Sequence, residues 1–294
     1  MAISSACAEV ASLDAGVVYA CFTHVPLRMQ FPDWVLPIHL GQVQGQGHLN
    51  LRDLAPEWEP HHPALGSTAG SFALKNYVLK HRPDATRVGM CQYRKFVSRE
   101  RIGALDNRYR PMDGVTKEKL PLEVFSRLLH PGDREFLISR PFSLAQHWKQ
   151  ARRMTYLRQY VRTHHVEDLL RLTAIAVELG VIEKAEVESF LEEDNLITGG
   201  IELGVYPAQF WLRATNSVET VIRECVRSHP GVRSGVQARS WSFCSERLGS
   251  FLLLKEFGAL GDHRLRFRRL TRAFPPGWVK RVAGQLTLIT DTET

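Results

Sequence analysis

The sequence has no apolar run of about 18 residues, the length that a helix needs to cross a membrane. Residues 1–13 lack both the positively charged start and the long apolar stretch of a secretory signal peptide, so we expect no such signal. The five cysteines are scattered, with no CxxC pair and no metal-ligand spacing, which is typical of buried thiols in a reducing compartment. These absences predict a cytoplasmic protein.

Enzyme signatures with strict spacing are missing too. Neither GxGxxG nor GxxxxGK[ST] occurs, so Rossmann dinucleotide binding and P-loop chemistry lose their main support. The sequence also lacks the GxSxG turn of α/β-hydrolases and the HExxH motif of zinc proteases. Any catalytic site must therefore be found from less specific clusters.

Negative charge is scarce in one segment near the end of the sequence. The net charge is +7, and residues 262–281 hold seven basic residues and one acid, which leaves the remainder nearly neutral. A neutral body disfavours a nucleic-acid-binding protein. Arg264, Arg266 and Arg268 alternate with apolar residues, which predicts a strand with one charged face. This strand either covers the core at the sheet edge or attaches the protein to an anionic membrane surface.

The overall composition is that of a globular protein, with 44% apolar and 23% charged residues. We divide the sequence into an N-terminal extension (1–15), one domain (16–260) and the basic segment (261–294). Residues 42–63, rich in Gly, His, Gln and Pro, are predicted to form a long loop.

Short β-branched and aromatic runs alternate with amphipathic stretches. Strands are predicted at 17–22, 34–40, 87–93, 135–139 and 201–206. Helices are predicted at 71–81, 122–129, 183–193, 208–228 and 245–257, with two more between 144 and 179. This alternation indicates an α/β fold with a mostly parallel sheet flanked by helices. Ligands bind such sheets at the carboxyl ends of the strands.

Two strand ends carry candidate binding residues. Gly41 closes the second predicted strand, either as a plain turn glycine or as a point where the backbone approaches a ligand. The third predicted strand ends in Gln92, Tyr93, Arg94 and Lys95. The two cations either form a solvated pair or bind an anionic group such as phosphate.

A third cluster, Ser245-Glu246-Arg247, opens a predicted helix. The serine suits an N-cap with an acid in the first turn, which stabilises a helix by ordinary means. The same residues can instead place one carboxylate in a pocket, and spacing does not separate the two interpretations.

In order and spacing, these clusters resemble the DUF4422 family of bacterial capsular-polysaccharide-type glycosyltransferases. The likeness covers about residues 16–257. The segments that carry it, with the family pattern in brackets, are the first strand to His24, 37–41 (PIQVG), 66–76 (ELTALYWIWKN), 88–96 (VGLCHYRRYF), 159–168 (QY…H…DL), 199–202 (GNMF) and 243–248 (FLSERL). Three positions depart from the pattern: Gly66 replaces a glutamate, Gln92 a histidine and Gly200 an asparagine.

The resemblance implies a GT-A-like nucleotide-sugar-binding fold and transfer of a sugar from a nucleotide-sugar donor to a polysaccharide or lipid-linked acceptor. It implies Glu246 as the catalytic base, with Arg247 positioning it or meeting phosphate. The implied donor-binding residues are His24, Gly41, Gln92, Tyr93, Arg94 and Lys95. The implied supporting residues are Tyr160, His164, Asp168 and Ser245.

The departures at Gly66, Gln92 and Gly200 leave a second hypothesis open, a non-catalytic nucleotide- or carbohydrate-binding relative. An Asp-x-Asp pair, which commonly holds the diphosphate of a nucleotide sugar through a divalent cation, is absent. We therefore expect no metal site and little need for Mg²⁺ or Mn²⁺, unless Asp194 or Glu202 serves as a single ligand. The expected location is the cytoplasm or the inner face of the membrane, without a nucleic-acid partner.

Overall fold

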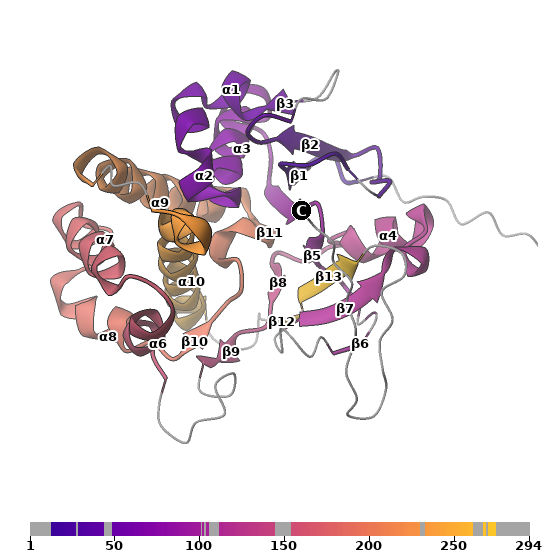
Figure 1. Cartoon of the computed structure of the whole chain (residues 1–294). Coiled ribbons are helices and arrows are strands. Elements are labelled where there is room, and N and C mark those ends of the chain that lie inside the picture. Colours follow the sequence, from indigo (N-terminus) through magenta and orange to yellow (C-terminus); the bar gives the residue numbers. More distant parts are fainter. Residues whose placement is uncertain are drawn as a thin grey trace, which may run out of the picture.

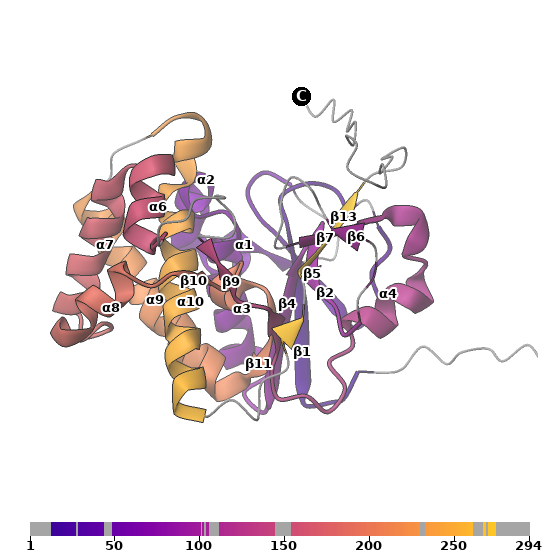
Figure 2. The same cartoon turned by 90° about the horizontal axis from the view of Figure 1, so that it is seen from below.

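The computed structural model describes residues 13–27, 29–43, 49–100, 102, 104–105, 112–144, 154–229, 233–260, 267–268 and 270–274. A central sheet separates a large group of helices from the single helix α4 (Leu122–Leu129) within this described part (Figures 1 and 2). The sheet and the helices together confirm the predicted α/β class.

One half of the sheet is parallel. Its strands are β1 (Val17–Thr23), β2 (Val35–His39), β3 (Leu49–Asn50) and β4 (Arg87–Gln92), in the order β3–β2–β1–β4. Every residue of β1 is buried, as expected for a strand covered on both faces. The carboxyl ends of β1, β2 and β4 consequently meet at one edge of the sheet.

The other half of the sheet corrects the prediction of a mostly parallel sheet. β11 (Gly204–Pro207) runs antiparallel to both β4 and β8 (Leu137–Ser139). A two-residue turn after Gln92 returns the chain as β5 (Lys95–Val97), also antiparallel to β4. The sheet is therefore mixed, because tight turns and not only helical crossovers connect its strands.

Part of the basic segment lies within the sheet. β12 (Phe267–Arg268) pairs with β8, and β13 (Leu270–Phe274) lies between β5 and β7 (Met112–Thr116), which pairs with β6 (Ala104–Leu105). The remainder of 261–294, like residues 1–12 of the predicted extension, lies outside the described residues.

The helical group comprises α3 (Ser67–His81), α6 (Tyr156–Thr163), α7 (Val166–Glu178), α8 (Val187–Leu191), α9 (Ala208–Ser228) and α10 (Ser240–Leu260). The boundaries predicted for α4 and α9 are confirmed. α10 begins five residues earlier than predicted, because Trp241 and Cys244 continue its buried face toward the N-terminus. Ser245 is therefore inside the helix, and its interpretation as an N-cap is wrong.

The predicted loop 42–63 is partly helical. It contains α1 (Leu51–Leu54), the 3-10 helix η1 (Pro56–His61) and the start of α2 (His62–Leu65). These elements are too short to show periodicity, and proline stands near the start of two of them. Trp58 anchors η1, because its Nε1 donates to Glu219 Oε1 on α9 at 2.8 Å.

Two further expectations can be compared with the described residues. Cys21, Cys91, Cys225 and Cys244 are buried and form no disulfide, as predicted for these four cysteines. In the same part of the chain, no helix is both long enough and apolar enough to cross a membrane.

Candidate functional site

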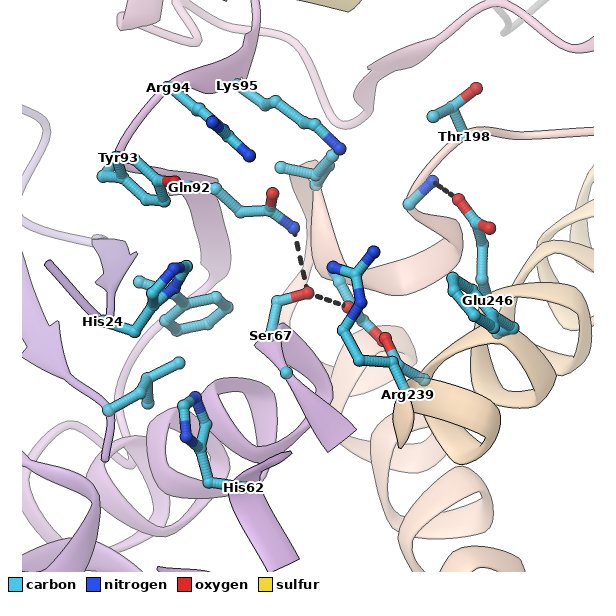
Figure 3. Close-up of a pocket in the computed structure, with 18 of the residues that line it drawn as sticks. His24, His62, Ser67, Gln92, Tyr93, Arg94, Lys95, Thr198, Arg239 and Glu246 are labelled. Carbon is cyan, nitrogen blue, oxygen red and sulfur yellow. Dashed lines mark hydrogen bonds between the residues drawn. The ribbon is translucent and has the colours of Figure 1, made fainter. Parts of the chain in front are cut away.

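A cavity of about 280 Å³ opens at the edge where the carboxyl ends of β1 and β4 meet. Its other walls are the beginning of α3, the 3-10 helix η4 (Gly200–Glu202) and the first turns of α10 (Figure 3). Six predicted site residues line it: His24, Gln92, Tyr93, Arg94, Lys95 and Glu246. The strand-end rule thus places the cavity correctly.

The turn from β4 to β5 forms a cationic wall. Tyr93 N donates to Phe22 O at 3.0 Å, which ties the turn to the end of β1. The Arg94 guanidinium carbon lies 5.1 Å from the centre of the Tyr93 ring, and the His24 ring meets that ring edge-on at 5.1 Å. Arg94 and Lys95 therefore line the cavity, and the packed rings of Tyr93 and His24 support the Arg94 guanidinium (Figure 3).

His62 also lines this side of the cavity, and the sequence prediction missed it because it lay in the presumed loop. Burial, with a smaller effect from His24, lowers the pKa of His62 to about 4, so the ring is neutral at neutral pH. Gly41 lies behind His62. At φ +67° a Cβ on Gly41 would come within 2.9 Å of His62 Nδ1, so glycine leaves room for this ring.

Glu202 is a buried carboxylate that joins three walls of the cavity. Its oxygens accept hydrogen bonds from Ser67 Oγ and Thr68 Oγ1, both at 2.5 Å, at the beginning of α3. Ser245 Oγ on α10 lies 2.7 Å from Thr68 Oγ1, and Gln92 Nε2 donates to Ser67 Oγ at 2.9 Å. Gln92 and Ser245, both predicted site residues, thus belong to one hydrogen-bond network centred on Glu202, which was considered from the sequence only as a metal ligand.

The charge state of Glu202 depends on opposing effects. Burial raises the pKa of Glu202 to about 7, and the nearby charge of Glu246 adds to the rise. Hydrogen bonds from Ser67 and Thr68 act in the opposite direction, because they stabilise the ionised form. The carboxyl group therefore titrates near neutral pH within the cavity wall.

Glu246 reaches the cavity from α10. Its Oε1 accepts a hydrogen bond from the backbone N–H of Gly199 at 2.8 Å, and 25% of its side chain is exposed. Gly200 allows η4 to approach the backbone of α10 closely, since a Cβ on residue 200 would lie 2.8 Å from Glu246 O and 3.1 Å from Ser250 N. The Gly200 departure from the family pattern is therefore matched by close packing of η4 against α10.

Arg247 points away from the cavity. It is buried, donates to Phe243 O at 2.6 Å and to Gln159 Oε1, and places its guanidinium 4.8 Å from the centre of the Tyr160 ring. Of its two implied roles, contact with phosphate does not fit this location. Its Nη1 lies 3.9 Å from Glu246 Oε2, which fits positioning of that carboxylate.

The remaining supporting residues lie behind the cavity wall. The His164 ring stacks on the cavity-lining ring of Phe243, with 4.2 Å between centroids. Tyr160 Oη donates to Ser240 O at 3.3 Å, and burial raises its pKa above the ordinary value. Asp168 accepts from Arg233 Nη2 at 2.7 Å. Tyr160 and His164 thus join the end of α6 to α10, Asp168 joins α7 to the segment before η5, and none of the three lines the cavity.

The acids considered as metal ligands differ in location. Asp194 accepts from Asn195 Nδ2 at 2.8 Å and is not part of the cavity lining, whereas Glu202 is. The described residues contain no group of three or more His, Cys, Asp or Glu side chains able to hold a metal ion.

No protein-family model and no curated protein sequence matches the chain. Among solved structures, the chain is similar to the apo structure of WbbM, a bifunctional glycosyltransferase, with a TM-score of 0.67. The match covers 91% of this chain and 48% of that chain at 12% identity, so this chain spans about half the length of WbbM. Membership of the DUF4422 family stays a prediction. The fold is α/β, a central sheet flanked by helices, as expected for a GT-A-like protein.

Proposed function

We propose that the protein transfers a sugar from a nucleotide-sugar donor to a hydroxyl group of a polysaccharide or lipid-linked acceptor. One observation carries this proposal: a cationic strand end, Arg94 and Lys95, and a carboxylate, Glu246, line the same cavity. Direct displacement at the anomeric carbon is assisted by both groups, a cation for the departing diphosphate and a base for the acceptor hydroxyl.

The strand side of the cavity would bind the donor. When the bond between the anomeric carbon and the phosphate oxygen breaks, its electron pair stays on the nucleoside diphosphate. Arg94 can bind phosphate oxygens through two parallel N–H groups, and Lys95 adds a point charge beside it. Tyr93 and Gln92 would orient the donor, with His24 and the neutral His62 beside the nucleoside.

Glu246 would accept the proton of the acceptor hydroxyl as its oxygen attacks the anomeric carbon. The Gly199 N–H holds Oε1 of Glu246, so the side chain has a defined orientation. Arg247 assists from behind through its 3.9 Å contact with Oε2. This arrangement supports a base that is oriented before the acceptor arrives.

The surroundings of two departures from the family pattern, Gly66 and Gln92, support this proposal. Gly66 leaves the beginning of α3 without an acid, and Glu202 brings a carboxylate to the same end of that helix. Gln92 is hydrogen-bonded into the same network through Ser67. These contacts favour an enzyme over the non-catalytic nucleotide- or carbohydrate-binding relative, which is the alternative.

Cofactor need and location are part of the proposal. Arg94 and Lys95 would offset the diphosphate charge, so we expect little requirement for Mg²⁺ or Mn²⁺. A lipid-linked acceptor places the enzyme in the cytoplasm at the inner face of the membrane. Its basic segment would bind anionic lipid there, and salt-sensitive co-sedimentation with anionic but not neutral vesicles would support this.

A donor panel tests the proposal. The purified protein is incubated with UDP-, GDP-, CMP- and dTDP-sugars, and slow hydrolysis of the donor is followed by release of the nucleotide. One donor hydrolysed above the spontaneous rate is expected. Binding without turnover across the panel would favour the non-catalytic relative, and neither binding nor turnover would contradict both.

A further inference from the structure

Arg239 lines the cavity from the side opposite Arg94 and Lys95 (Figure 3). It is the last residue of the 3-10 helix η5 (Gly235–Arg239), directly before α10, and it is exposed. Within the described part of the chain its side chain makes no hydrogen bond or ion pair, and its guanidinium carbon lies 5.3 Å from the centre of the Phe243 ring. A stacked guanidinium keeps the N–H donors at its edge available for a ligand.

The Phe243 ring beneath Arg239 is held in place by contacts with the end of α6. The Phe243 ring stacks on His164 with 28° between the planes, and burial lowers the pKa of His164 to about 4, so this ring is neutral. Gln237 Nε2 donates to Thr163 O at 2.9 Å, and its Oε1 lies 3.3 Å from His164 Nδ1. Because an amide oxygen only accepts, Nδ1 carries the proton. η5 is therefore fastened to α6.

Arg239 and Phe243 share one face with the proposed base. Arg239, Phe243 and Glu246 follow one another at spacings of four and three, and all three line the cavity. An acceptor whose hydroxyl reaches Glu246 must therefore lie along this face. A half-buried aromatic ring suits the apolar face of a sugar ring, and a guanidinium suits a planar carboxylate or a phosphate.

Charge indicates what kind of acceptor fits. In the proposed function, Arg94 and Lys95 meet the diphosphate of the donor, while Glu246, and Glu202 in its ionised form, add negative charge to the cavity. A neutral acceptor needs no further cation there, whereas an acidic acceptor would be repelled without one.

We propose that Arg239 and Phe243 form an acceptor subsite for an acidic sugar, with the sugar ring on Phe243 and its carboxylate or phosphate on Arg239. This rests on the proposed function, since Glu246 must be the base that faces the acceptor. It also gives His164 a role, as the neutral ring that supports Phe243.

Binding of simple sugars tests the subsite separately from turnover. Glucose, glucuronic acid and glucose 6-phosphate are titrated into the full-length protein, with and without UDP, and followed by ligand-observed NMR. At least one of the two acidic sugars should bind about tenfold more tightly than glucose, a difference in binding free energy of about 1.4 kcal/mol. The ratio between the two distinguishes a carboxylate subsite from a phosphate subsite.

Variants then assign the preference. Arg239→Gln should abolish the preference for acidic sugars without changing the affinity for UDP, and Arg239→Lys should keep part of the preference. Phe243→Leu should lower the affinity for all three sugars by the same factor. Arg213→Gln, an exposed arginine of α9 outside the cavity, is the matched control. Equal binding of glucose and the acidic sugars would overturn the proposal, as would a loss of UDP affinity in Arg239→Gln. Absent donor turnover with an intact preference would instead contradict only the glycosyltransferase proposal.

Discussion

The two sides of the cavity are built in different ways. The strand side takes Gln92, Tyr93, Arg94 and Lys95 from one unbroken stretch of sequence at a single turn. The helix side combines two segments that lie far apart in sequence, η4 and the continuous stretch of η5 and α10, and packing brings these two together. The strand side is mainly cationic, whereas the helix side combines the carboxylates of Glu202 and Glu246 with the Phe243 ring and one cation, Arg239. This difference predicts that damage to one side changes donor affinity and damage to the other changes turnover.

Glu246→Gln should have the largest effect. The amide cannot accept the acceptor proton, so turnover should fall by about two to four orders of magnitude, the usual contribution of a positioned base. Donor affinity should stay within experimental error, because the diphosphate is bound on the other side. Turnover and calorimetry are measured on the variant and on Glu188→Gln, an exposed acid of α8. Equal turnover in Glu246→Gln and the native protein would remove this residue as the base.

Glu202→Gln should change how stability depends on pH. The folded-state pKa of Glu202, about 7, lies above the ordinary value of 4.5, so the folded protein holds a proton that the unfolded chain releases. Folding stability contributed by this group therefore falls as pH rises from about 4.5 to 7, by up to about 3 kcal/mol. The glutamine variant lacks this fall.

Thermal unfolding between pH 5 and 8 measures the effect. The melting temperature of Glu202→Gln relative to the native protein should rise with pH and level off above about pH 7. A constant difference across this range would show that Glu202 does not titrate there. Glu188→Gln again serves as the control, because that side chain is exposed.

Arg94→Ala should weaken nucleoside diphosphate binding by about tenfold to a hundredfold, the loss expected for one charged hydrogen-bonding group. Arg94→Lys should lose less, because it keeps the charge but not the paired N–H geometry. Calorimetry with UDP and the other nucleoside diphosphates makes the measurement. Unchanged affinity in Arg94→Ala would end its assignment to the diphosphate.

Chelation should have the smallest effect. If Arg94 and Lys95 offset the diphosphate charge, EDTA should change the rate of donor turnover by less than about twofold. Activity that EDTA abolishes and Mn²⁺ restores would assign part of this task to a metal ion. Glu202→Gln, tested with added Mn²⁺, would then show whether that carboxylate is the ligand.

Sequence patterns predicted the continuous parts of this molecule well. The apolar run of β1, the period of α9 and the cationic end of β4 all depend on neighbouring residues, and all were recognisable. Glu202, His62 and Arg239 were not assigned to the cavity, because its walls come from segments far apart in the sequence and no local pattern marks these three residues as neighbours of the β4 end. Arg247 illustrates the converse, since a matching motif did not reveal that its side chain points inward.

The position of β13 has a consequence for how the donor side of the cavity forms. β13 pairs with β5, and Arg272 lies opposite Lys95, yet about 170 residues separate these strands in sequence. Contacts of such large sequence separation form slowly, and a ribosome delivers β5 long before β13. Until then, β5 has an open edge that can pair with other chains. The segment that carries Lys95 is thus among the last parts of the sheet to be completed during synthesis.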